Sequence, residues 1–146
     1  YGFYERLAQQ ENICAYITDQ IKRGENFSVF DRSALDIHVY SEFFLSKLLN
    51  EFRPEPKDFR AFETHLNTIR QYFSTLDFIF IIQPGIKFVN VTNSCSEEIQ
   101  ESINEIFLNT AALHLPKDKY FIIPREITKL EERVKICQKV LNKKLA

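Results

Sequence analysis

The stretch that decides the predicted fold is Phe27–Tyr40, which reads FSVFDRSALDIHVY. Its first four residues are a short apolar run of β-prone side chains, which predicts a buried strand, Phe27–Phe30. The residues after Ser33 have helical spacing, and Asp36 stands three positions further on, as in a capping box. The polar corner Asp31-Arg32-Ser33 therefore joins a strand to a helix. Because ligands of parallel sheets bind beyond the carboxyl ends of the strands, this corner is the first candidate site.

Length and composition are those of one globular domain, residues 1–146. Hydrophobic residues make up 45% of the chain and charged residues 27%, which is typical of a folded protein rather than a disordered one. The formal net charge is −1 at pH 7, so the chain as a whole has no electrostatic attraction to nucleic acid or to an acidic membrane. We therefore expect neither nucleic acid nor a membrane as a partner.

Cysteine usage predicts a reducing compartment. The chain has three cysteines, an odd number, without a Cys-x-x-Cys motif, which indicates free thiols. Neither the cysteines nor the three histidines have metal-ligand spacing, so no metal site is predicted. No apolar run has the length of a membrane span and no signal peptide is recognisable, and we expect a cytoplasmic protein. The sequence also lacks methionine, even at position 1, from which we expect a processed chain or a fragment.

The rest of the chain alternates helical and extended patterns. Two further runs, Phe78–Ile82 and Tyr120–Ile123, are continuously apolar and β-prone, as in parallel strands buried on both faces. Helical spacing covers the segments around the three predicted strands, at about residues 3–23, 35–52, 58–74, 97–114 and 131–141. Strands separated by helices predict right-handed crossovers. The predicted fold class is α/β, a three-layer parallel sheet in which the three strands are neighbours and helices cover both faces.

Polar residues follow each predicted strand, and the carboxyl ends of parallel strands share one edge of a sheet. The corner Asp31-Arg32-Ser33 follows the first strand, Lys87 comes after the second, and Arg125 follows the third. The arginines and the lysine are cations suited to phosphate, with Asp31 as a metal-water ligand or a base. The alternative is that Asp31 and Ser33 only cap the following helix and that Arg32 pairs with a surface acid.

The corner and the segments around it resemble the P-loop nucleoside and nucleotide kinases, in particular the nicotinamide riboside kinase-like ATPase domains and the deoxynucleoside kinases. The pattern Asp31-Arg32-Ser33-x-x-Asp36-x-x-x-Tyr40 after a strand is similar to the Asp/Glu-Arg-Ser corner and the following helix of those families. Residues 76–84 are similar to their next core strand, and Gly85-Ile86-Lys87 to the start of their lid. Residues 120–123 and 131–141 are similar to their last strand and helix.

This resemblance implies transfer of the γ-phosphate of ATP, bound with Mg²⁺, to a nucleoside-like small molecule, or ATP hydrolysis. By the same resemblance, Asp31 and Arg32 are the catalytic residues. Asp31 would hold the acceptor hydroxyl or the magnesium shell, and Arg32 would hold the phosphates or the acceptor. The residues that would bind substrate or phosphate are Ser33, Asp36, Lys87 and Arg125.

One departure from these families concerns the phosphate loop. Their motif G-x-x-x-x-G-K-[ST], which joins the first strand to the first helix, is absent, and the only glycines are Gly2, Gly24 and Gly85. We therefore expect a partial P-loop NTPase-like domain that lacks the first strand and the phosphate loop. Such a chain is not competent as a kinase alone, and a missing N-terminal segment or a protein partner would complete it. The alternative function is a non-catalytic interaction subunit or a degenerate kinase-fold protein.

Overall fold

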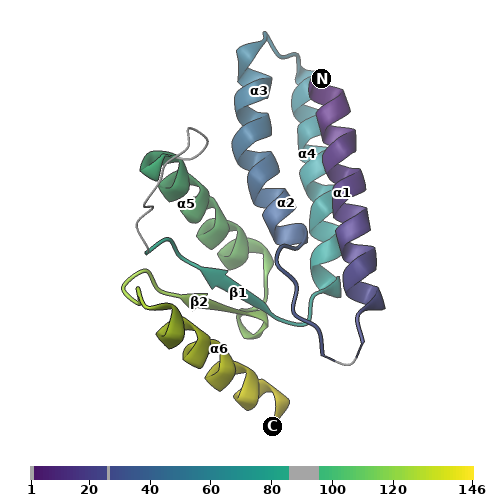
Figure 1. Cartoon of the computed structure of the whole chain (residues 1–146). Coiled ribbons are helices and arrows are strands. Elements are labelled where there is room, and N and C mark those ends of the chain that lie inside the picture. Colours follow the sequence, from purple (N-terminus) through teal and green to yellow (C-terminus); the bar gives the residue numbers. More distant parts are fainter. Residues whose placement is uncertain (1, 26, 86–95) are drawn as a thin grey trace.

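The computed structural model describes residues 2–25, 27–85 and 96–146 (Figure 1). The α-helices are α1 (Phe3–Arg23), α2 (Ala34–Tyr40), α3 (Ser46–Glu51), α4 (Pro56–Arg70), α5 (Glu97–His114) and α6 (Leu130–Leu145). The strands are β1 (Ile79–Ile82) and β2 (Tyr120–Ile123). Three shorter turns complete the described elements, the π-helical η1 (Ser41–Leu45) and the 3₁₀-helical η2 (Gln71–Thr75) and η3 (Lys117–Lys119).

Helices α1 and α4 and the continuous rod α2–η1–α3 pack lengthwise as a bundle (Figure 1). The buried residues of α1 recur at helical steps, which places an apolar stripe against the other two rods, at Phe3, Leu7, Cys14 and Thr18. Helix α4 begins at Pro56, whose fixed φ suits the first helical turn, and Asp58 closes a capping box with Glu55. None of the helices in the described ranges combines the length and the apolar character that crossing a membrane requires.

Two apolar clusters fill the interior. The first joins the bundle to the sheet, with members from α1, α2, α5 and β1 that include Cys14, Leu35, Ile81 and Ile103. The second lies between α1, α4 and the η1–α3 part of the rod, and consists of Phe3, Leu7, Leu45, Leu49, Phe62 and Leu66. The first cluster therefore contains the beginning of α2 and the sheet in one continuous core.

The two strands form a parallel sheet with Ile79 opposite Tyr120 and Ile82 opposite Ile123. Figure 1 shows α5 along one side of this pair and α6 along the other. Because side chains alternate along a strand, one face carries Ile79, Ile81, Tyr120 and Ile122, which pack into the first cluster. The opposite face carries Phe80, Ile82, Phe121 and Ile123. On that face the Ile82 side chain is 57% exposed and that of Phe121 is 36% exposed.

The predicted three-layer parallel sheet is wrong. In the described residues the sheet has two strands only, and the chain is mostly helical. The run Phe27–Phe30 is not a strand, and Phe27 and Val29 are 60% and 81% exposed. The physical reason is that β-propensity measures how well a side chain fits a half-buried sheet, so an apolar run forms a strand only where a neighbouring strand pairs with it. No described strand pairs with this run.

The turns that follow the two strands are held together by helix α6. Arg133 of α6 is 7% exposed, and its Nε donates to the Ile127 carbonyl at 2.6 Å. Its Nη2 donates to the Gln83 carbonyl at 3.1 Å, which joins the end of β1 to the segment after β2. Gly85 lies between these groups, and a Cβ there would overlap the Arg125 carbonyl oxygen and come 2.7 Å from Nη2 of Arg133. This close backbone approach requires glycine.

Replacement of Gly85 by alanine should therefore destabilise the protein, by about 1 to 3 kcal/mol, since the added methyl group forces the two turns apart. The change in the free energy of unfolding can be measured by urea denaturation. Gly2→Ala is the matched control, because the nearest atom to a Cβ at Gly2 is 4.0 Å away. Equal stability of the two variants would contradict the packing of α6 against the ends of the strands.

Candidate functional site

The polar corner begins helix α2 and is built as a cap. The backbone N–H and the hydroxyl of Ser33 donate to Oδ2 of Asp36 at 2.8 and 3.2 Å, and the Ser33 hydroxyl accepts from the N–H of Leu35 at 3.2 Å. Burial raises the pKa of the Asp36 carboxyl, and the hydrogen bonds from Ser33 oppose this shift. Two of the four residues predicted to bind substrate or phosphate, Ser33 and Asp36, thus hold the first turn of a helix.

Arg32 has an unusual backbone conformation. Its φ is +92°, and it is the one residue other than glycine with positive φ in the described ranges. Its side chain is exposed, and its guanidinium lies 5.9 Å from the centre of the Tyr40 ring. Asp31, the other predicted catalytic residue, is exposed. A left-handed conformation costs an L-residue free energy, so Arg32 stores strain at the corner.

The two arginines of the predicted cation cluster, Arg32 and Arg125, do not lie together. Arg125 makes a bidentate pair with Glu101 of α5, at 2.7 and 2.8 Å, and this pair lowers the pKa of Glu101 and raises that of Arg125. Figure 1 places the segment before α2 well apart from the turn after β2. Lys87 lies outside the described residues. The expectation that these side chains share one edge depended on Phe27–Phe30 forming a strand of the same sheet, which it does not.

A buried polar network lies between α1, η1 and α4. The Nδ1 atom of His65 is 2.9 Å from a carboxylate oxygen of Glu11, and its Nε2 atom is 3.1 Å from the Ser41 hydroxyl. Because a carboxylate can only accept, Nδ1–H donates to Glu11 and Nε2 accepts from Ser41. A serine, a histidine and an acid in this order have the hydrogen bonds of an acyl-transfer relay. Ser41 and His65 are each only 1% exposed, so no substrate reaches the hydroxyl and the network is structural.

A second buried histidine lies one helical turn before this network. Nη1 of Arg70 is 3.0 Å from Nε2 of His38, and because a guanidinium only donates, the proton of His38 is on Nδ1. This Nδ1 is buried and has no hydrogen-bond partner among the described residues, and the nearest acid, Glu42, is 3.8 Å away. Burial, with Arg70 and His114 nearby, lowers the pKa of His38 to about 3. His38 is therefore neutral in the folded protein.

These buried histidines were not predicted from the sequence as a network. His65 lies on the face of α4 that also carries Phe62 and Ile69, which could have indicated that it is buried. Its partners Glu11 and Ser41 are 54 and 24 positions away, and no local pattern connects them. In the described ranges, no group of three or more histidine, cysteine or acidic side chains is arranged to hold a metal ion.

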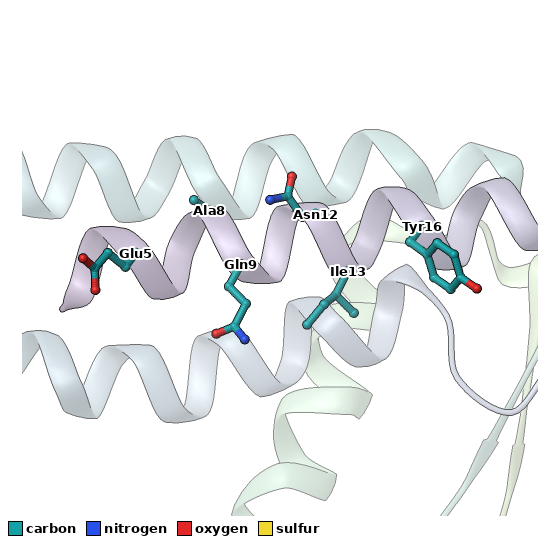
Figure 2. Close-up of a pocket in the computed structure, with 6 residues that line it drawn as sticks. All are labelled: Glu5, Ala8, Gln9, Asn12, Ile13 and Tyr16. Atoms are coloured by element: carbon teal, nitrogen blue, oxygen red, sulfur yellow. The ribbon is translucent and has the colours of Figure 1, made fainter. Parts of the chain in front are cut away.

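A surface hollow lies on the outer side of α1 (Figure 2). Its volume is about 590 Å³, and it is lined by Glu5, Ala8, Gln9, Asn12, Ile13 and Tyr16. All six lining residues belong to α1, and Figure 2 shows their side chains spread along that helix. The hollow has one charged group, Glu5, and Tyr16 is 66% exposed. It offers neither the enclosure nor the convergent polar groups of a small-molecule site.

The remaining unusual feature is the open edge of the sheet. The N–H of Gln83, just after β1, donates to the Ile123 carbonyl at 3.1 Å, so the backbone groups of Gln83 face β2. Backbone groups of successive residues alternate between the two sides of a strand. The N–H and C=O groups of Phe80 and Ile82 therefore face away from β2. Since the sheet has two strands in the described residues, this edge of β1 is unpaired there.

Comparison with protein-family models, with curated proteins and with solved structures finds no match to this chain. The resemblance to P-loop kinases is therefore corrected. No family model supports it, and the two-stranded sheet lacks the three-layer architecture that it implied.

Because the buried His38 is neutral, we expect the stability of the folded protein to fall at low pH. Its pKa is about 3 when folded and 6.5 when unfolded, so the unfolded chain binds more protons below pH 6.5 and stability falls as the pH decreases. The loss attributable to His38 should reach up to about 1.4 kcal/mol per pH unit. His38→Gln keeps an acceptor for Arg70 but cannot titrate, and it should flatten the dependence between pH 6.5 and about 5 in chemical denaturation.

The exposed His114 provides the control, because His114→Gln should leave most of the acid sensitivity in place. If His38→Gln loses as much stability on acidification as the unaltered protein, the buried neutral histidine does not cause the pH dependence.

The strain at Arg32 predicts a difference between two neighbouring substitutions. Glycine has no steric penalty at positive φ, so Arg32→Gly should be more stable than Asp31→Gly by about 1 kcal/mol. Both variants add one glycine to the unfolded chain, so that entropic cost cancels in the comparison. Thermal melting measures the difference. Equal melting temperatures would show that the conformation of Arg32 is not strained.

Proposed function

We propose that this protein is a non-catalytic interaction subunit that binds an extended polypeptide segment as an additional strand on the free edge of β1. The observation that carries this proposal is the edge of β1 at the backbone groups of Phe80 and Ile82, which no strand of the described residues pairs with. A buried parallel strand normally has a neighbour on both sides, and a two-stranded sheet is marginal without further packing.

Backbone chemistry defines the class of ligand. The edge presents N–H donors and C=O acceptors at the regular spacing of a strand, and another polypeptide backbone matches that spacing. The side chains near the edge define its character, because Ile82 is 57% exposed and Phe78 and Phe80 are partly exposed. A segment with small or β-branched apolar side chains would cover them. The bound segment is therefore extended, apolar and uncharged at its centre.

The edge of β1 is favoured over the outer edge of β2 by the position of α6. The Lys144 ammonium of α6 donates to the Asp118 carbonyl in η3, directly before β2, and lies 4.8 Å from the centre of the Phe78 ring. These contacts hold the end of α6 next to the beginning of β2. The contacts of α6 with Gln83 and Ile127 involve the turns after the strands and do not use the free backbone groups of β1.

Transfer of phosphate from ATP with Mg²⁺ to a nucleoside-like molecule stays a prediction from the sequence. The geometry favours it less than strand binding. Ser33 and Asp36 cap α2, and Arg125 is engaged by Glu101. A phosphate site would need these groups to be available to a ligand.

Strand addition can be tested with the peptide acetyl-Lys-Thr-Val-Thr-Val-Thr-Val-Lys-amide. The peptide should bind and should slow hydrogen exchange at the amides of Phe80 and Ile82, because both amides become paired. Ile82→Pro removes one of these N–H groups without removing a bond to β2, and proline is tolerated at sheet edges. This variant should bind at least about tenfold more weakly, the factor expected for loss of about 1.4 kcal/mol.

Ile122→Pro is the control for the outer edge of β2, since it removes the N–H that faces away from β1 and should leave binding unchanged. Because the Ile122 side chain also packs into the first cluster, circular dichroism first verifies that this variant is folded. Binding that survives Ile82→Pro and is lost in Ile122→Pro would move the site to β2. If the peptide protects neither Phe80 nor Ile82, the proposed function is wrong.

A further inference from the structure

We infer that a second copy of this chain supplies the added strand, and that the strand is Phe27–Phe30. This inference rests on the proposed function, because it uses the same free edge of β1. The part of the chain that the structure describes contains a sheet edge that no strand pairs with and a strand-forming run that pairs with no strand. In one molecule the two do not pair, since the described sheet contains β1 and β2 only. If the run of each copy paired with the β1 edge of the other copy, both the run and the edge would have a partner.

The run has the side chains that the edge requires. Phe27, Val29 and Phe30 are 60%, 81% and 41% exposed, and Ser28 is exposed as well. The four residues carry no charge, and Phe27, Val29 and Phe30 have high β-propensity, so the run can pair with β1 without burying an ion. Their exposure in the single copy is unfavourable, because three of these four side chains are apolar and remain in contact with water. Pairing with β1 of another copy would remove part of this surface from water.

The pairing of run and edge is reciprocal, which is the requirement for a closed dimer. Each copy offers one run and one edge, so run to edge and edge to run can form at the same time around a two-fold axis, and no binding surface is left over. The net charge of −1 per chain gives little repulsion between copies. Each exchanged strand is only four residues long, so the interface is small and the dimer should be weak and dependent on concentration.

Sedimentation equilibrium tests this assignment over protein concentrations from about 5 to about 500 µM, the range that a small interface requires. The average mass should rise from 17.3 kDa toward twice that value as the concentration increases. Val29→Pro breaks the run and should give a monomer at all these concentrations. Val29→Asp serves as a second variant, since Val29 is 81% exposed and neither change affects the core. Leu113→Lys, which removes an equally exposed apolar side chain of α5, should dimerise normally.

Mixing two variants gives the sharpest test. Val29→Pro retains an intact β1 edge, and Ile82→Pro retains an intact run, so each alone should be monomeric. Together they should form a heterodimer through the one remaining pairing, which can be observed by fluorescence energy transfer between separately labelled variants. Mixtures of a variant with itself should show no transfer. Heterodimer formation supports strand exchange, and its absence overturns it.

The outcomes separate this inference from the proposed function. If the chain is monomeric at every concentration and still binds the valine–threonine peptide at β1, the second copy is not the partner, and the proposed function stands. If Val29→Pro dimerises like the unaltered chain, the run is not the exchanged strand. If neither self-association nor peptide binding occurs, both proposals fail.

Discussion

Helix α2 packs against α1, α4 and α5, and five of its seven residues are buried. A helix of this length is not stable alone in water, so it depends on the packing of its neighbours as they depend on it. The cap formed by Ser33 and Asp36 sets its first residue, and Leu35 then enters the same cluster as Ile81 of β1. Through this one helix, the bundle and the sheet share a continuous apolar core.

The same rod also carries the buried polar groups of the bundle. The π-helical turn η1 begins at Ser41, where the hydroxyl meets His65 of α4, and His38 one turn earlier meets Arg70 of the same helix. A buried polar group is costly unless it is hydrogen-bonded. Both ring nitrogens of His65 meet this condition, whereas Nδ1 of His38 has no partner among the described residues. These polar contacts join α1, the rod and α4. The contact between His38 and Arg70 requires His38 to be neutral, because its Nε2 accepts from the guanidinium.

The sheet differs from the bundle, because its apolar side chains pack well on one face while backbone groups at one edge have no pairing strand in the described residues. Ile79 and Ile81 pack into the core, which holds β1 in place although it has one neighbouring strand in the described residues. The exposed run Phe27–Phe30 is the complementary feature, with side chains suited to a sheet and no described strand beside it. Both features support the proposed strand binding, and three of the predicted site residues, Ser33, Asp36 and Arg125, make structural contacts instead.

The sequence alone determined the local elements. Helical spacing placed α1 at residues 3–23, the apolar runs gave β1 and β2 within one residue, and the Ser33–Asp36 pair identified the cap of α2. These features depend on residues within about four positions of one another. The tertiary structure decided what depends on distant partners. Phe27–Phe30 lies outside the described sheet, because a strand forms only beside another strand. Arg125 forms an ion pair with Glu101 of α5. His65 contacts Glu11 and Ser41 because the packing of α1, η1 and α4 brings these three residues together. Such contacts are fixed by the packing of whole elements, and no spacing along the chain records them.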